Sequence, residues 1–493
     1  MIPRDSVAGE IVIPWKVLLK DCLLIASMMG VCAIHQYAVL AVIAVLVVLS
    51  LRSTLFAVQS LSILFLLIYI NPAIQLQSPQ LLIFRWAVFF AATGRIFLTV
   101  LGKGGGVYQI RPILYLHIFC GLAFVTNMIA NPASPVGYLK LFAFAFGATA
   151  IFAAAAFNTV SRDRLFTWLL AMCVVIVWLS IPFLATPAGY FSKMRQIEIA
   201  QAGDYVDVGS NYLGGFMGIL GHAQSFGTVA ALVCTFLFVT IFFSKYRVRW
   251  IAITTFLIAL AMLYLSKART GGLAFMIAGG MVMLAAAVGG SATRRVHRAM
   301  NLPAIPIVVL GGLVLLAGLL LGGSDIAKGA RGFIEKGDKG SGMGILEAYQ
   351  ESRGGLIELS LANFKLHPAF GIGFGRNSWE AQGYAVETAG GILSFAFSPT
   401  EKGQIATAVL EETGVLGFLA FLVMIGSFVV FFLRGANVYG LGLFVCALGL
   451  NMGEMNLFAM GGLGMLEWLF IAFGGMLADR CSDPVLPLGS AAR

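Results

Sequence analysis

Long apolar runs without charged residues, separated by short polar links, make up most of this 493-residue chain. A helix needs about 20 apolar residues to cross the hydrocarbon core of a bilayer, so each run is a candidate span. The run at 212–243 is long enough to hold a re-entrant or interfacial turn before its membrane part. The pattern predicts an all-α polytopic membrane protein with about 14 transmembrane helices, at residues 17–34, 37–51, 54–71, 81–101, 112–130, 137–157, 165–186, 212–243, 250–266, 270–290, 304–322, 405–433, 436–454 and 459–478.

One long region, 323–404, departs from this apolar pattern. From Arg353 to Phe364 apolar and polar residues recur at helical spacing, which predicts an amphipathic helix lying along a membrane surface. Three glycines at 371, 373 and 375 follow it and predict a turn. The chain thus divides into N-terminal transmembrane helices (1–211), transmembrane helices that carry two of the motifs below (212–322), the large loop (323–404), C-terminal transmembrane helices (405–480) and a disordered tail (481–493).

Composition supports the membrane class and excludes others. The chain is 59% hydrophobic and 11% charged, with a mean hydropathy of +0.93, which is too apolar for a soluble protein. Its net charge of +10 comes from basic residues scattered singly or in small groups between apolar runs. That distribution is typical of membrane topology signals, so we expect no nucleic-acid partner. Six of the seven cysteines lie inside apolar runs and form no paired-cysteine metal motif.

The basic residues also predict the orientation of the chain. The short links at 35–37, 71–80 and 131–136 hold no Lys or Arg, whereas the links between them do. Because Lys and Arg gather in cytoplasmic loops, the first set faces outward. Both termini are then cytoplasmic, and the loop 323–404 lies on the outer face. Whatever chemistry the protein performs is expected at the outer leaflet.

Two basic motifs lie on this outer face. Ser266-Lys267-Ala268-Arg269-Thr270-Gly271-Gly272 is a tight turn whose two cations run against the positive-inside tendency. Glu351-Ser352-Arg353-Gly354-Gly355 begins the amphipathic helix, and the planar fork of an arginine matches phosphate oxygens. Ordinary readings remain open for both: a snorkelling turn for the first, and an interfacial anchor to lipid headgroups for the second.

Two further motifs carry candidate proton acceptors. Gly221-His222-Ala223-Gln224-Ser225 places a histidine within an apolar segment, where it is either functional or bonded to a neighbouring helix. Glu401 stands at the lip of the span that begins near 405, where it is either a general base or a salt-bridged residue that orders the loop.

Together these motifs resemble the superfamily of O-antigen ligases and O-antigen polymerases, membrane glycosyltransferases that use polyprenyl-diphosphate-linked glycans. The resemblance covers about the C-terminal 60% of the chain. It rests on GHAQSFG at 221, SKARTGG at 266, ESRGGLIELSLANFKLHPAFGIGFG at 351 and ATAVLEETGVLGFLAFL at 406. The His-Asn pair that such proteins usually carry before an E-x-G-x-x-G helix is missing here. This departure favours the exopolysaccharide-polymerase side of the superfamily.

The resemblance implies a polymerase or ligase at the periplasmic face of a bacterial inner membrane. Its donor would be a glycan on undecaprenyl diphosphate, and its acceptor a second glycan. Arg269 and Arg353, with Lys267 and Arg376, would bind the diphosphate, and Glu401 or His222 would take the acceptor proton. No cofactor and no metal are expected. A flippase and a chain-length regulator are further possible partners.

Two other classes of function remain open. A lipid-linked oligosaccharide flippase or other transporter would have internal repeats and a charged central cavity, whereas here the charges gather at one face. A signalling or assembly protein with a passive outer loop would tolerate replacement of Arg269 or Arg353. The sugars, the linkage and the choice between polymerase and ligase stay undetermined.

Overall fold

The computed structural model describes residues 14–35, 37–71, 74, 84–102, 108, 110–157, 160–190, 215–243, 250–288, 350–382, 402–435 and 437–477. Throughout these ranges the regular structure is helical, with an isolated bridge between Ile70 and Leu220. The expected span at 304–322, the candidate base Glu401, the tail and most of the loop 323–404 lie outside the described residues.

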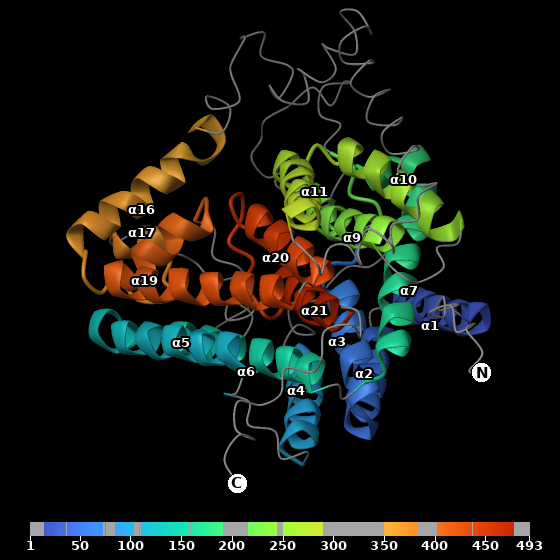
Figure 1. Cartoon of the computed structure of the whole chain (residues 1–493), viewed down its shortest axis with the longest axis horizontal. Helices are drawn as coiled ribbons and strands as arrows, with labels where there is room; N and C mark the ends of the chain where they lie inside the picture. Colours follow the sequence, from blue (N-terminus) through green and yellow to red (C-terminus); the bar gives the residue numbers. More distant parts are fainter. Residues whose placement is uncertain are drawn as a thin grey trace, which may run out of the picture.

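Figure 1 shows the helices in chain order. They are α1 (Trp15–Ile34), α2 (Ala38–Arg52), α3 (Thr54–Ile68), α4 (Arg85–Gly102), α5 (Arg111–Ala130), α6 (Pro135–Ala156), α7 (Arg162–Ser180), α9 (Ala223–Phe243), α10 (Trp250–Leu265), α11 (Arg269–Val288), α16 (Gly355–Leu366), α17 (Ser378–Ala381), α19 (Ile405–Arg434), α20 (Val438–Leu450) and α21 (Leu463–Met476). Short 3-10 turns follow α7 at Ile181–Ala185 and Pro187–Gly189, and one π-helical turn, η5 (Gln350–Gly354), precedes α16.

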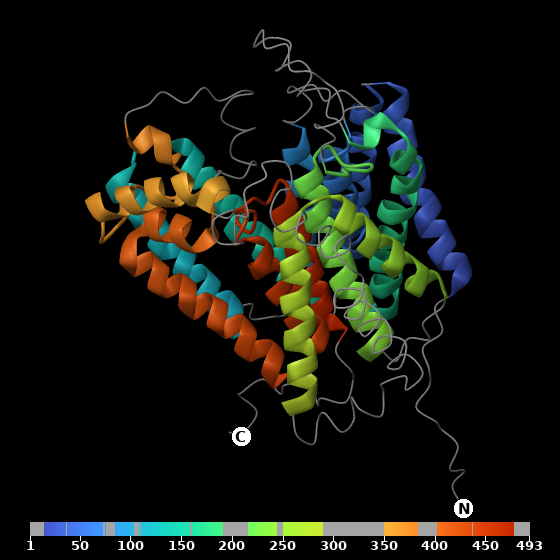
Figure 2. The same cartoon turned by 90° about the horizontal axis from the view of Figure 1, so that it is seen from above.

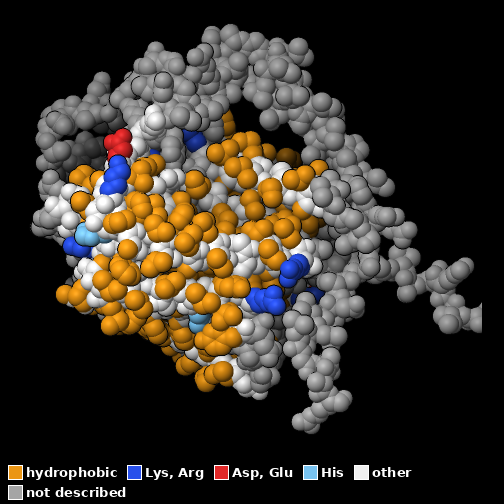
Figure 3. Space-filling model, turned by 60° about the vertical axis from the view of Figure 1, so that its left-hand side comes forward, with side chains coloured by type: hydrophobic (Ala, Val, Ile, Leu, Met, Phe, Trp, Pro, Cys, Tyr) orange, Lys and Arg blue, Asp and Glu red, His pale blue; other side chains and the backbone are white. Residues whose placement is uncertain are grey.

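The helices have the length and composition of membrane spans. Eight of those described are long and apolar enough to cross a membrane, namely α1, α4, α5, α6, α7, α9, α11 and α19, and five shorter apolar helices accompany them. Every predicted span that falls within the described ranges overlaps one of these helices. In Figure 3 hydrophobic side chains cover a broad area of one face, while charged side chains show in small groups near its edges. The described part of the chain is thus all-helical, and its long apolar helices are compatible with a polytopic membrane protein.

The segment 212–243 behaves as its length predicted. Its described part begins as an irregular stretch from Gly215 to His222, and α9 starts only at Ala223. The bridge from Leu220 to Ile70 and the hydrogen bond from the Asn71 N–H to the Ile219 carbonyl (2.8 Å) tie this stretch to the end of α3.

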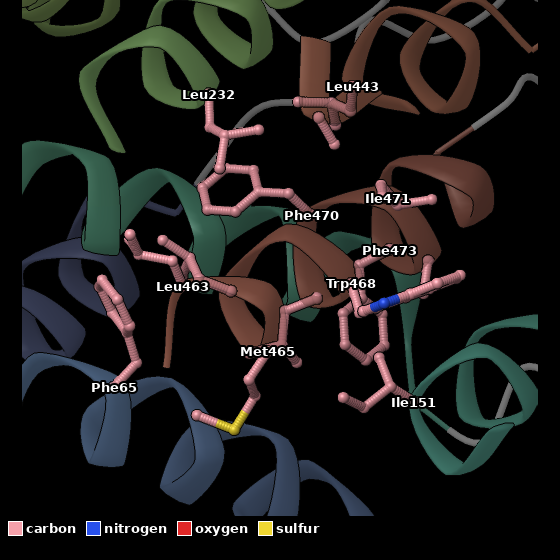
Figure 4. Packing of buried hydrophobic residues seen from close by; sticks show 14 of the residues in the cluster. Phe65, Ile151, Leu232, Leu443, Leu463, Met465, Trp468, Phe470, Ile471 and Phe473 are labelled. Carbon is pink, nitrogen blue, oxygen red and sulfur yellow. The ribbon is translucent and has the colours of Figure 1, made fainter. Parts of the chain in front are cut away.

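Helix α21 forms the centre of the core. Nearly all of its side chains are buried, and helices α3, α6, α9 and α20 pack around it. Figure 4 shows Met465, Trp468 and Phe470 of α21 among side chains from these neighbours, including Phe65 and Leu232. A helix that is apolar on all sides is typical of a protein core or of a membrane span. Among the helices in Figure 1, α21 has the central, enclosed position.

Helix α19 is broken at Gly414, which has φ +65° and ψ −168°. The break leaves backbone groups without partners inside the helix, and the glycine turn that follows α16 satisfies them. The N–H groups of Ile372 and Gly373 donate to the carbonyls of Glu411 and Glu412 at 2.9 and 3.0 Å. A Cβ at Gly414 would lie 2.3 Å from the Ala369 carbonyl oxygen, so only glycine permits this docking.

The docked turn places α16 and α17 against one end of α19. Figures 1 and 2 show both helices beside α19, on the side of the molecule that also contains α5, while α1, α2, α7, α9 and α10 lie on the other side. Phe374 anchors the turn, since its ring packs edge-on to those of Phe119 and Phe458 with centroids 6.4 and 5.5 Å apart. The polar segment is thus fixed to the membrane helices on one side of the molecule.

Candidate functional site

The turn between α20 and α21, residues 451–462, is where several candidate segments meet. Its shape is set by Asn451, whose side-chain oxygen accepts hydrogen bonds from the N–H groups of Asn456 and Leu457, both at 2.7 Å. The Asn451 amide donates to Glu467 of α21 at 2.8 Å. The Asn451 carbonyl also accepts from the N–H of Ile405, the first residue of α19, at 2.9 Å. We call residues 451–462 the Asn451 turn.

The basic turn between α10 and α11 lies next to the Asn451 turn. Lys267 is exposed and has a positive φ of 56°, and the partly buried Arg269 is the first residue of α11. A Cβ at Gly453 would lie only 2.5 Å from the Thr270 hydroxyl oxygen. The side chain of Thr270, the residue after Arg269, therefore packs against the Asn451 turn.

Arg353 reaches the same turn from a different part of the chain. It lies on the π-helical turn η5, a type of distortion that is frequent at functional sites. Its guanidinium is 3.8 Å from the Glu454 carboxylate, and its side chain is 13% exposed. Gly403 packs against this segment, because a Cβ there would lie 3.6 Å from the Arg353 carbonyl oxygen. The two arginine segments thus border one turn.

His222 stands just before α9, beside the basic turn. It is exposed, and its ring Nδ1 accepts a hydrogen bond from the Gln224 N–H at 3.2 Å. One turn further along α9, Gly227 lies so close to Ala268 that a Cβ at Gly227 would be 2.0 Å from the Ala268 Cβ. The histidine motif and the basic turn are therefore neighbours in space.

Arg376 lies elsewhere. Its guanidinium donates to the backbone carbonyl of Glu380 in α17 at 3.5 Å. Within the described residues, no hydrogen bond or ion pair joins Arg376 to the Asn451 turn. The structure thus brings Arg269, Arg353, Lys267 and His222 towards one region, whereas Arg376 is held at α17.

A buried cluster of charged side chains, which the sequence analysis did not predict, lies beneath α16. We call Lys402, Glu411 and Glu412 the buried ion cluster; all three side chains are fully buried. The Lys402 ammonium lies 3.1 Å from Glu411 and 3.0 Å from Glu412. Burial disfavours its charge, but attraction to Glu412 and Glu411 outweighs burial and raises the pKa of Lys402. A pair of adjacent glutamates inside an apolar run was the available sequence signal.

Glu411 connects the buried ion cluster to α16 and α17. One carboxylate oxygen accepts from the hydroxyls of Ser360 and Ser378 at 2.8 and 3.0 Å, and the other accepts from the Asn363 amide at 2.6 Å. Charge-assisted bonds of this kind are about twice as strong as neutral ones. Because η5 and α16 are continuous, these bonds also fix the position of Arg353.

Helix α16 confirms that this segment is helical, and two of its polar side chains face the protein. Ser360 and Asn363 are buried, whereas Leu361 and Leu366 are 36% and 69% exposed. A polar face can be buried here because Glu411 supplies its hydrogen-bond partner. The exposed side is mixed, because Glu358 and Lys365 are exposed beside Leu361 and Leu366. Contact of α16 with a membrane surface therefore stays a prediction.

Glu454 is the second residue that the sequence predictions missed. Its segment was assigned to the end of the span 436–454, although α20 ends earlier, at Leu450. A carboxylate close to the end of an apolar run was the only local signal. Within the described ranges no group of three or more His, Cys, Asp or Glu side chains could hold a metal ion.

Comparison of the chain with known protein families and with curated proteins finds no match.

Proposed function

We propose that this protein is a membrane glycosyltransferase that polymerises or ligates glycans carried on undecaprenyl diphosphate. The acceptor would be a second glycan, and the reaction would take place at the outer, periplasmic face of a bacterial inner membrane. One observation carries the proposal: the segments that contain Arg269 and Arg353 both contact the Asn451 turn, the first through Thr270 and the second through Glu454. Two arginines from distant parts of a chain, beside a membrane, are what recognition of a lipid diphosphate requires.

The chemistry needs no nucleotide, because the glycan is already activated. An acceptor hydroxyl oxygen attacks the anomeric carbon of the donor, and the bond from that carbon to the diphosphate oxygen breaks. Its electron pair leaves on undecaprenyl diphosphate, and the hydroxyl proton passes to a base. Arg269 and Arg353, with Lys267 nearby, stabilise the negative charge that builds up on the leaving diphosphate.

The proposed topology has about 14 spans with both termini in the cytoplasm. Lys365 near the end of α16 and Arg434 at the end of α19 are both exposed. Helix α16 is bonded to Glu411 near the start of α19, whereas Arg434 is the last residue of α19. Lys365→Cys should therefore react with a membrane-impermeant thiol reagent on intact spheroplasts. Arg434→Cys should react only after permeabilisation, with the wild-type cysteines as background. The reverse pattern would overturn the outer-face assignment.

The function itself is tested with purified protein in detergent or liposomes. Given an undecaprenyl-diphosphate-linked glycan and an acceptor, the protein should release undecaprenyl diphosphate and form a longer glycan. In cells that lack the protein, single-repeat surface glycans would identify a polymerase, and free polymer on the carrier lipid would identify a ligase. Movement of intact lipid-linked glycan across liposomes, without release of the lipid, would instead identify a flippase.

A further inference from the structure

Glu454 is the carboxylate that the fold brings to Arg353. Its Oε1 lies 3.8 Å from the guanidinium, and its side chain is 29% exposed, so solvent and substrate can reach it. Its Oε2 accepts a hydrogen bond from the Asn456 amide at 3.3 Å. The N–H of Asn456 is itself held by Asn451. A carboxylate oriented by a fixed neighbour has the support that a proton acceptor needs.

Three other glutamates near these helices are fully buried, unlike Glu454. Glu411 is fully buried and accepts from three polar side chains as well as pairing with Lys402. Glu412 is fully buried beside the same lysine. Glu467 is fully buried in α21 beneath Asn451. A buried, bonded carboxylate cannot meet a glycan hydroxyl, whereas Glu454 stands at an accessible edge beside Arg353.

We propose that Glu454 is the general base that takes the acceptor proton, and this inference rests on the proposed glycosyltransferase function. In the unliganded protein the Glu454 carboxylate occupies the anion position next to Arg353. When the donor binds, its diphosphate takes this position, because a phosphate offers more oxygens to the arginine fork than one carboxylate does. Glu454 then lies beside the bond that breaks, and its carboxylate accepts the proton from the attacking hydroxyl.

The long distance between Arg353 and Glu454 suits the proposed exchange of the carboxylate for a diphosphate. At 3.8 Å the ion pair is longer than the 2.7–2.9 Å typical of a charge-assisted hydrogen bond. The pair is long and partly open to solvent, with the Glu454 side chain 29% exposed, so an incoming diphosphate can displace it. The neighbouring negative diphosphate also disfavours a second negative charge, and Glu454 becomes a better proton acceptor in the complex.

Glu454→Gln keeps the shape of the side chain but cannot accept the proton. We expect kcat to fall on the order of a hundredfold to ten-thousandfold, while the Kd for undecaprenyl diphosphate stays the same or falls, because a competing anion has been removed. In Glu454→Ala, added formate should restore part of the turnover. The matched control is Glu358→Gln, an exposed carboxylate in the first turn of α16, which should retain wild-type turnover.

Three results would overturn the inference while leaving the proposed function intact. The first is wild-type turnover in Glu454→Gln. The second is a loss of turnover matched by an equal loss of affinity for undecaprenyl diphosphate, which would make Glu454 a structural residue. The third is a lack of formate rescue in an Ala variant that folds and binds the lipid normally. A wild-type protein that forms no glycosidic bond would refute the proposed function itself.

Discussion

Replacement of Lys402 by methionine is expected to lower the free energy of unfolding by about 3–5 kcal/mol, the usual cost of removing one partner from a buried ion pair. Methionine fills much of the lysine volume, so the loss is electrostatic. It leaves the carboxylates of Glu411 and Glu412 buried without the cation that lies 3.1 and 3.0 Å from them. The measurement is the thermal unfolding of the purified protein in detergent, followed by loss of its monodisperse peak.

A matched control separates this effect from the loss of any lysine. Lys365→Met removes an exposed lysine from the last turn of α16 and should change the melting temperature little. Adding Glu412→Gln to Lys402→Met removes one of the two stranded charges and should recover part of the loss, since residues in one network are not additive. Equal stability of Lys402→Met and wild type would contradict the charged state assigned to the cluster.

The pH dependence of this cluster follows from the direction of the shift. The folded pKa of Lys402 is raised above its ordinary value of 10.5. A raised lysine pKa stabilises the fold fully below the unfolded pKa, and that contribution is lost as the pH rises through the folded pKa. The Lys402 contribution is therefore constant across the physiological range and is lost only in strong alkali.

Alanine at Arg269 or Arg353 is expected to slow turnover on the order of a hundredfold. A charge-assisted contact to the leaving diphosphate is worth roughly 2–3 kcal/mol, and 1.36 kcal/mol corresponds to a factor of ten in rate. Lysine keeps the charge but loses the planar fork, so Arg269→Lys and Arg353→Lys should be impaired less than the alanine variants. The assay is glycan product formed from the lipid-linked donor, with EDTA present to test for a metal.

The double alanine variant should be little slower than the slower single variant, because residues that act as a unit are not additive. Arg434→Ala, an exposed arginine at the far end of α19, is the control and should be fully active. The melting temperature of each variant, measured beside its turnover, separates a loss of stability from a loss of diphosphate binding. Full activity in both single alanine variants would remove the support for diphosphate recognition at this site.

The long apolar runs in the sequence determined the helical architecture by themselves. A chain in lipid must satisfy its backbone polar groups within each segment, so a long apolar run has to become a helix. For this reason the predicted spans coincide with helices wherever the structure describes them, from α1 to α21. The local spacing of polar and apolar residues likewise predicted α16. The long segment 212–243 predicted the irregular entry to α9 because its length exceeded a single span.

Other features depended on contacts between residues far apart in the chain, which no local pattern encodes. The break of α19 at Gly414 exists because the glycine turn after α16 supplies the missing hydrogen bonds. The burial of Lys402 and Glu411 is tolerable only because α16 and α17 bring further hydrogen-bond donors to the carboxylate. Glu454 meets Arg353 only because α20 ends early and the Asn451 turn folds against η5. Tertiary structure decided these pairings because buried charges and broken helices are stable only when distant segments complete them.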